Sequence, residues 1–488
     1  MNRSRDRHGF AAELVDESLA SARLSPQDRR FVTQLVFGCL RRSGTLDALL
    51  KPFIKIPLHA VQPRVWDVLR LGAFQLVFLT HVPKHAAVHE TVELASHVGA
   101  PKATGFVNGV LRRVSELVTD EFAVRSAADA VPFDIVAEPT TPVTLAPAVR
   151  GERVAARSSH RGKEKNQVAG SGAPSLQGGV GGAIHRYRKL TRPVFPDPAS
   201  DFAGYFESAH SFPRWLANRW LDRHGPAECE RLGFWFNAPP PLWVRVNKLH
   251  FDREAYRLLL AAALVGAEPG EHPQSLRLLA HHHVRDLPGY AEGDFAVQDH
   301  SSMLVASALG VRPGMQVLDL CAAPGGKTTH LAELMDNRGR VTACDIDAKR
   351  LETVATLCQR LGVKIVETVL VTEDGEYPPG PFDAALVDVP CSNTGVIGRR
   401  PEVRWRLKPN EFEHLVRLQT LLLIEALTRV KPGGAVVYST CSIEPEENEG
   451  VVGAVCKGMR GVALEAEHKA IPGRPSDGGY WARLRKPK

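Results

Sequence analysis

The chain has 488 residues, of which 44% are hydrophobic and 24% charged, so it is long enough for about three domains that each bury a core. These values exclude collagen-like, coiled-coil and wholly disordered proteins. Lys and Arg number 61 against 54 Asp and Glu, a net charge of +7 that is compatible with a nucleic-acid partner but does not establish one.

Eight cysteines are spread along the chain without a C-x-x-C pair. This spacing argues against a zinc module or a disulfide framework, and it favours a reducing cytoplasm. We expect no metal site. The longest apolar stretches are too short to span a bilayer, and the first ten residues are polar, so we expect neither a membrane anchor nor a signal peptide.

Residues 1–120 predict a helical bundle, because apolar residues recur at helical spacing. Ser25 followed by Pro26 is typical of a helix start, and further helical patterns cover 65–78, 86–96 and 104–118. The basic pairs at 41–42 and 112–113 are candidates for phosphate contacts; a solvated helix face explains them equally well.

Periodicity disappears over 121–205, where basic residues are followed by Gly-Gly pairs and prolines. Such a segment buries too little apolar surface to offset its chain entropy, so we predict a flexible basic linker. It is either an inert tether or a source of nonspecific RNA affinity.

Residues 206–290 predict a small α+β unit, with a helix near 215–224, a strand over 242–246 and a helix over 253–265. Strand patterns near 276–279 and 295–298 complete it. From Met315 onward strands and helices alternate, which is typical of a doubly wound parallel α/β sheet, and we assign 291–488 to that domain.

An apolar strand over 317–320 runs into a loop of small residues, Cys321–Lys327, that opens a helix. Gly326-Lys327-Thr328 matches the second half of a phosphate-binding P-loop, but Cys321 stands where that motif needs its first glycine. Asp345 follows Gly326 by nineteen residues, at the end of the next strand, and an acid there suits ribose hydroxyls. This favours an adenosine cofactor over a nucleoside triphosphate.

Two cysteines follow two later strands. Cys391 comes three residues after Asp388, which ends the strand over 382–387, and Cys441 lies just beyond the strand over 435–439. Because the carboxyl ends of parallel strands meet at one edge of a sheet, we expect both thiols in one crevice. Either cysteine alone would most simply be a buried inert thiol.

These elements resemble the Sun (RsmB) family of RNA cytosine-5 methyltransferases. The resemblance rests on CAAPGGKT at 321–328, D-x-P-C at 388–391 and T-C followed by E-P-E-E-N at 440–448. It extends to D-R-R-F-V at 28–32, which looks like a NusB-like RNA-binding domain. The chain departs from the family pattern at Val389, Asn393 and His300.

The resemblance implies S-adenosylmethionine as cofactor and gives roles to named residues. Cys441 would be the nucleophile that adds to cytosine carbon 6, Cys391 would aid release, and Asp388 would contact the base and the cofactor. The residues implied to bind the cofactor are Cys321, Ala322, Ala323, Pro324, Gly325, Gly326, Lys327, Asp345, Asp374 and Asp388. A thiol titrates near ~8.5, so we expect Lys327 and the cofactor's charge to favour a Cys441 thiolate.

The implied partner is RNA, most simply 16S rRNA in a single-stranded or loop region, bound by a monomer. Arg399, Arg400 and Arg404 are candidates for holding the RNA backbone. The alternatives are tRNA or another rRNA as substrate, an idle RNA-binding assembly factor, and a nucleotide hydrolase. Retention of both cysteines argues against the idle factor, and Cys321 argues against the hydrolase.

Overall fold

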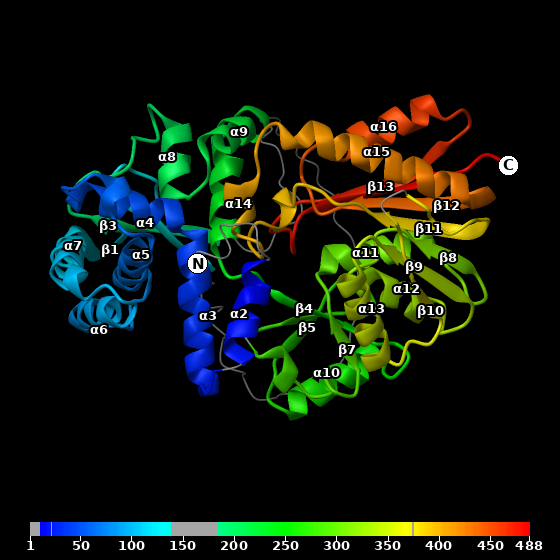
Figure 1. Ribbon diagram of the computed structural model, residues 1–488, viewed down its shortest axis with the longest axis horizontal. Helices are drawn as coiled ribbons and strands as arrows, with labels where there is room; N and C mark the ends of the chain where they lie inside the picture. The colour runs from blue at the N-terminus through cyan, green and yellow to red at the C-terminus, as the bar shows by residue number, and fades with distance from the viewer. Residues whose placement is uncertain (1–9, 21, 138–182, 281, 373–374) are drawn as a thin grey trace, which may run out of the picture.

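The fold is described from a computed structural model that defines residues 10–20, 22–137, 183–280, 282–372 and 375–488. Figure 1 shows a helical bundle at left, a large sheet covered by helices at right, and a small sheet below and between them. This arrangement confirms the predicted fold class. Within the described residues, no helix is both long and apolar enough to cross a bilayer.

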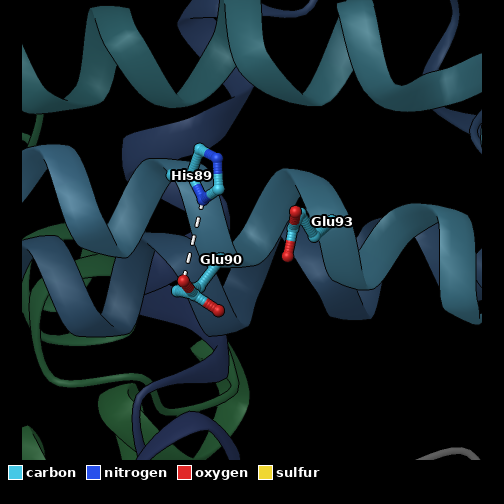
Figure 2. Close-up of side chains that lie close together, drawn as sticks. All are labelled: His89, Glu90 and Glu93. Atoms are coloured by element: carbon cyan, nitrogen blue, oxygen red, sulfur yellow. Dashed lines mark ion pairs between the residues drawn. The ribbon is translucent and has the colours of Figure 1, made fainter.

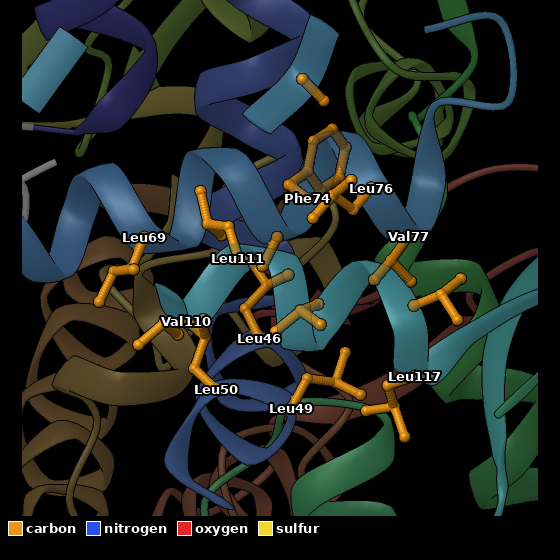
Figure 3. Close-up of a cluster of buried hydrophobic side chains, with 14 of the residues drawn as sticks. Leu46, Leu49, Leu50, Leu69, Phe74, Leu76, Val77, Val110, Leu111 and Leu117 are labelled. Atoms are coloured by element: carbon orange, nitrogen blue, oxygen red, sulfur yellow. The ribbon is translucent and has the colours of Figure 1, made fainter. Parts of the chain in front are cut away.

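The N-terminal bundle consists of α-helices joined by short 3-10 turns. The helices are α2 (Ala11–Ala20), α3 (Pro26–Arg41), α4 (Ser43–Leu50), α5 (Pro63–Phe78), α6 (Lys84–His97) and α7 (Thr104–Leu117), and the turns are η1 (Lys51–Phe53), η2 (Leu58–Ala60) and η3 (Pro101–Ala103). The predicted start of α3 is confirmed, because the Ser25 side chain accepts a hydrogen bond from the backbone N–H of Asp28. Leu46 and Leu49 of α4 pack with Leu111 of α7 in one core (Figure 3).

A three-stranded antiparallel sheet contradicts both ends of the linker predicted over 121–205. Its strands are β1 (Val118–Ala123), β2 (Ala130–Ala137) and β3 (Ala183–Leu190), in the order β1-β3-β2. The basic composition of β3 does not make it a linker, because Arg188 is buried, pairs with Asp120 and donates to the carbonyl of Val77. The middle of the predicted linker, 138–182, lies outside the described residues.

The small unit is an antiparallel sheet with helices beside it. Its elements are α8 (Phe202–Ala209), α9 (Arg214–Asn237), β4 (Leu242–Val246), α10 (Arg253–Ala262), β5 (Ala267–Pro269), β6 (Ser275–Leu278), η4 (Val284–Asp286) and β7 (Phe295–Val297). The sheet order is β5-β6-β4-β7. Helix α9 extends beyond the predicted 215–224 across a kink at Gly225. The predicted boundary at 290 falls before β7, although β7 pairs with β4.

The large sheet has seven strands in the order β10-β9-β8-β11-β12-β14-β13. Its elements are α11 (His300–Leu309), β8 (Gln316–Asp319), α12 (Gly326–Leu334), β9 (Arg340–Asp345), α13 (Ala348–Arg360), β10 (Val366–Leu370), β11 (Phe382–Asp388), η5 (Thr394–Val396), α14 (Val403–Arg406), α15 (Glu411–Arg429), β12 (Val430–Thr440), α16 (Glu449–Gly458), β13 (Ala463–Ala470) and β14 (Gly479–Arg485). The first five strands are parallel, and β14 is antiparallel to both neighbours.

Side chains alternate between the two faces of this sheet, as the period of a strand requires. Val436 and Tyr438 of β12 pack under α15 and α16, whereas Val437 packs with α11 and α12 on the opposite face. The chain proceeds outward from β8 to β10 and then returns to β11 beside β8. Ligands of such sheets bind outside the carboxyl ends of the strands at this switch point.

The bundle meets the rest of the chain through buried arginines. Arg41 donates to the carbonyl of Gly398 at 3.0 Å, Arg42 donates to that of Pro132 at 2.5 Å, and Arg404 donates to that of Arg41 at 3.0 Å. All three side chains are buried. The hypothesis of phosphate contacts at 41–42 is therefore wrong, as is the solvated alternative, because these cations satisfy backbone carbonyls at a domain junction.

The small unit meets the large sheet through a buried ion pair. Arg245 of β4 lies 2.6 Å from the carboxylate of Glu333 in α12, and both side chains are fully buried. Gln274 also donates to Glu333, at 2.8 Å. Arg245 further donates to the carbonyl of Gly326 at 2.6 Å, so the small unit directly supports the first turn of α12.

Candidate active site

The loop between β8 and α12, Cys321–Lys327, leaves room for close approach of a ligand. Gly325 has φ +100°, and a Cβ there would lie 3.1 Å from the Cα of Val354, so this position requires glycine. A Cβ on Gly326 would meet nothing within 4 Å. The first N–H groups of a helix have no partner within it, so this open space suits a polar or anionic group.

Asp345 lies beside this loop at the end of β9, the position predicted from its spacing. Its carboxylate accepts a hydrogen bond from the backbone N–H of Ala323 at 3.3 Å and pairs with Arg350 at 3.2 Å. Each carboxylate oxygen can accept more than one hydrogen bond. The residues present therefore fit an adenosine cofactor, because an acid next to an open glycine loop can still bind ribose hydroxyls.

Asp319 is a site residue that the sequence analysis did not assign. It ends β8, is 1% exposed, and accepts a hydrogen bond from Thr328 at 2.7 Å. Its other oxygen is buried with no hydrogen-bond partner among the described residues. Burial raises the pKa of Asp319 to about 7. The sequence could have identified Asp319 as a site residue, because it is the acidic residue of the run 317–320 that directly precedes the loop.

Lys327 and Asp388 form an ion pair across the switch point. The Lys327 Nζ lies 2.6 Å from one Asp388 oxygen, and Ser439 donates to the other at 2.7 Å. Burial lowers the pKa of Lys327, but Asp388 outweighs it, so the pKa is raised and the ammonium stays charged. Because Asp388 neutralises this charge locally, Lys327 contributes less to a Cys441 thiolate than the sequence led us to expect.

The two cysteines are brought together at the carboxyl ends of β11 and β12. The Sγ atoms of Cys391 and Cys441 lie 3.2 Å apart, and both residues are partly exposed. The hydrogen bond from Cys391 lowers the pKa of Cys441 against the effect of burial, and the same bond raises that of Cys391 well above its usual range. Cys441 is therefore the sulfur of the pair that loses its proton more easily.

A buried carboxylate holds the two cysteine loops. Glu447 is fully buried and accepts hydrogen bonds from the backbone N–H of Ser392 at 2.8 Å, from Ser442 Oγ at 2.5 Å and from Gln419 at 2.9 Å. Ser392 follows Cys391 and Ser442 follows Cys441. Glu447 thus fixes the distance between the two sulfurs, although sequence reasoning had only noted it as part of a motif.

The three arginines expected to hold RNA lie in different environments. Arg404 is buried in the domain junction, so the prediction of an RNA contact is wrong for this residue. Arg399 pairs with Asp299 and Asp477. Only Arg400 points to the cysteines, because it donates to Asn393 at 2.8 Å. The sequence pattern around a basic residue does not show whether its side chain is buried, paired with acids or directed to the site.

Asp374, implied as an adenine contact, lies outside the described residues. Among the described residues, one group of His and acidic side chains is close enough to share an ion: His89, Glu90 and Glu93. Figure 2 shows these side chains on one face of α6, with an ion pair between His89 and Glu90. All three are exposed, and exposed acids commonly cluster without an ion, so this group supports no metal chemistry.

The geometry favours thiol chemistry beside a cofactor. Ionisation makes a thiol a strong nucleophile, and the lowered pKa of Cys441 favours ionisation at the edge of the sheet where the Cys321–Lys327 loop also lies. A nucleotide hydrolase fits less well, because Cys321 occupies the first glycine position of a P-loop.

Comparisons with known proteins cover all three parts of the chain. A model described as the NusB family matches residues 2–116, one described as an RsmF/B-like ferredoxin-like domain matches 212–285, and one described as 16S rRNA methyltransferase RsmB/F matches 306–472. The domain matches follow the order of the bundle, the small unit and the large sheet.

Whole-length relatives carry matching names. The chain is 32% identical to the probable ribosomal RNA small subunit methyltransferase B of Bacillus subtilis, covering 90% of this chain and 83% of that one. It is 31% identical to ribosomal RNA small subunit methyltransferase B of Salmonella typhi, over 95% and 92%. A crystal structure of a methyltransferase homolog from Pyrococcus horikoshii is 27% identical, with a TM-score of 0.51 over 58% of this chain and 97% of that one.

Proposed function

Because this chain belongs to the RsmB/F family of rRNA methyltransferases, which depend on S-adenosylmethionine, we propose that it methylates carbon 5 of a cytosine through a covalent bond to Cys441. Family membership confirms the resemblance predicted from the motifs. The observation that carries the proposal is the 3.2 Å separation of the Cys391 and Cys441 sulfurs. Carbon 5 methylation needs one group that adds to the ring and a second that assists release, and this pair supplies both.

The first step is addition of the Cys441 thiolate to cytosine carbon 6. Carbon 5 of cytosine is a poor nucleophile, but the new C6–S bond pushes an electron pair toward carbon 5. Asp388 accepts a hydrogen bond from the cytosine edge, and the Lys327 ammonium 2.6 Å from it offsets the negative charge that develops on the ring. Carbon 5 then forms its bond to a methyl group, which the cofactor supplies from its positively charged sulfur.

The second step is release, and it requires a base at carbon 5. When Cys441 is ionised, Cys391 stays protonated, because it then donates the hydrogen bond between the two sulfurs and its own pKa is raised by that bond. Once Cys441 is bonded to carbon 6, that negative charge is gone and Cys391 can lose its proton to solvent. The Cys391 thiolate then takes the proton from carbon 5, its electron pair restores the C5–C6 double bond, and Cys441 leaves as a thiolate.

The cofactor roles follow the loop geometry. We assign the cofactor's binding to the loop Cys321, Ala322, Ala323, Pro324, Gly325, Gly326 and Lys327 together with Asp388, and its ribose hydroxyls to Asp345. Two observations support the assignment. There is open space beside Gly326, and one buried oxygen of Asp319 has no hydrogen-bond partner among the described residues. Asp374 keeps its expected adenine contact as part of the same proposal.

The substrate is small-subunit rRNA, since the whole-length relatives are named for acting on it. The target base must leave its stack to reach Cys441, which costs a few kcal/mol and favours a single-stranded or loop position. Transfer RNA is the second candidate, and the same assay tests it.

The test uses the full chain, tritiated S-adenosylmethionine and unmodified 16S rRNA or tRNA, with nucleoside mass spectrometry of the product. Wild type yields 5-methylcytidine in 16S rRNA. Cys441→Ala yields none, Cys391→Ala accumulates a covalent protein–RNA adduct, and Cys456→Ala, a partly exposed cysteine of α16, matches wild type. Undiminished transfer by Cys441→Ala would sink the mechanism, and methylation of tRNA in place of rRNA would replace the substrate.

A further inference from the structure

Arg400 lies beside the proposed nucleophile but has no part in the steps above. Its Nη1 donates to the Oδ1 of Asn393 at 2.8 Å, and Cys441 in its thiol form donates to that same oxygen at 3.2 Å. One amide oxygen therefore joins the guanidinium to the sulfur. The guanidinium lies within the roughly 6 Å over which an opposite charge shifts the titration of a side chain.

Two contacts fix this arrangement. Asn393 has a left-handed backbone with φ +58°, and its Nδ2 donates to the carbonyl of Cys391 at 2.7 Å, so the amide is held from both ends. The ring of Phe10, which directly precedes α2, lies 4.1 Å from the guanidinium carbon of Arg400. A cation against an aromatic face is attracted by its quadrupole. The N-terminal segment thus touches a residue next to the cysteine pair.

The charges that face Cys441 come from several elements and are not equivalent. Lys327 of α12 is paired with Asp388 of β11, so its positive charge is opposed by a nearby carboxylate. Cys391 acts through its hydrogen bond. No carboxylate among the described residues forms an ion pair with Arg400, which is the largest positive electrostatic influence on the thiol and helps to lower its pKa.

Resting on the assignment of Cys441 as nucleophile, we propose that Arg400 is a positioning residue whose charge holds the Cys441 sulfur as a thiolate, and that Phe10 keeps the guanidinium in place. Phe10, which precedes α2, thereby contributes to the surroundings of the cysteine pair at the edge of the large sheet. Displacing Phe10 would leave the cysteines in position but make Cys441 a weaker nucleophile at neutral pH.

The test measures the rate at which iodoacetamide alkylates Cys441 between pH 6 and 10, in the full chain without RNA, by fragment-ion mass spectrometry. Arg400→Gln raises the midpoint of this profile by about one pH unit, because the thiolate loses its nearest unopposed cation. Arg400→Lys keeps the charge and stays near wild type. Phe10→Ala gives an intermediate shift. Arg417→Gln, which removes an exposed charge from α15, leaves the midpoint unchanged.

A midpoint for Arg400→Gln equal to that of wild type overturns the proposal, whatever the methyl transfer activity of the variant. If Arg400→Gln does not fold, as judged by circular dichroism, Phe10→Ala decides, and a wild-type midpoint there overturns the proposal as well. Failure of the proposed function would give a different result from failure of the Arg400 proposal, because Cys441→Ala would then retain methyl transfer. An alkylation shift in the Arg400 and Phe10 variants, absent in Arg417→Gln, supports the proposal.

Discussion

The two halves of the site are built by different means. The cofactor half, which is the loop 321–327 with Asp319 and Asp345 that we propose to bind the cofactor, is shaped by backbone geometry that consecutive residues encode. The thiol half, Cys391 and Cys441 with their loops, is held by buried hydrogen bonds that converge on Glu447. A backbone turn fails through local strain, whereas a convergent network fails when its one shared acceptor is lost. The thiol half is therefore the more sensitive to a single substitution.

The largest effect is expected from Glu447→Ala, which removes the central carboxylate of the thiol half. Glu447→Ala removes the acceptor of the Ser392 backbone N–H, of one Gln419 N–H and of the Ser442 hydroxyl, at a cost of about 1–3 kcal/mol for each buried donor that finds no other partner. The cysteine loops move apart, and a displacement of about 1 Å lowers kcat roughly 100-fold. Methyl incorporation into rRNA measures this loss, and a dithiol-specific trivalent arsenical measures the separation of the sulfurs directly.

The matched control is Glu446→Ala, which removes a neighbouring carboxylate that is 47% exposed and pairs with arginines of α9. It should retain both arsenical binding and methyl transfer within a few-fold. If Glu447→Ala also retains both, the thiol half does not depend on its central carboxylate and the contrast between the halves is wrong.

A smaller effect is expected from straining the cofactor half. Gly325→Ala forces a side chain onto a residue at φ +100° and against Val354, which costs about 1–3 kcal/mol. We expect S-adenosylmethionine to bind about tenfold more weakly by calorimetry, with the alkylation profile of Cys441 unchanged. Gly453→Ala in α16, where a Cβ meets nothing within 4 Å, is the control. Equal cofactor affinity in the Gly325 and Gly453 variants would contradict this account.

The smallest effect concerns the cofactor half, where the ionisation of Asp319 makes the stability of the fold depend on pH. Burial raises the pKa of Asp319 from 3.8 to about 7, so the folded chain holds a proton that the unfolded chain has released. Stability from this group is complete below pH ~4, is lost as the pH rises to about 7, and stays lost above it. Asp319→Asn removes that dependence.

In differential scanning fluorimetry without cofactor, Asp319→Asn should therefore raise the thermal midpoint at pH 8 by about 2–4 °C relative to wild type. The difference should vanish about one unit below pH ~4, where the aspartate is protonated in both states. A constant difference at both values would show that the effect comes from packing and not from ionisation.

The same contrast explains what sequence reasoning found. The loop 321–327, the alternation of strands and helices and the meeting of the two cysteines were all predictable, because each depends on local patterns and on the common edge of a parallel sheet. Glu447 and Arg400 were not assigned their roles, because their partners lie in loops joined only by folding. A carboxylate or guanidinium has no periodicity that reveals whether it is buried.

Buried cations caused the clearest errors. The pair 41–42 and Arg404 read as basic surface, yet they cap backbone carbonyls at the junction of the bundle with the rest. Arg188 of β3 is a further buried cation, because pairing with Asp120 and a helix carbonyl lets a charged side chain lie inside. From composition alone, each such residue is expected to be exposed to solvent. Only the tertiary contacts show that it is buried.

The three-stranded sheet also changes the meaning of the segment 138–182. Ala137 and Ala183 are direct cross-strand partners in β2 and β3, so the chain leaves this sheet and re-enters it at one point. Residues 138–182 therefore connect two neighbouring strands of one sheet, and they do not connect two domains. A longer or shorter connection between Ala137 and Ala183 would leave the spacing between the bundle and the large sheet unchanged. Closing a longer loop costs only about 0.6 kcal/mol per doubling of its length.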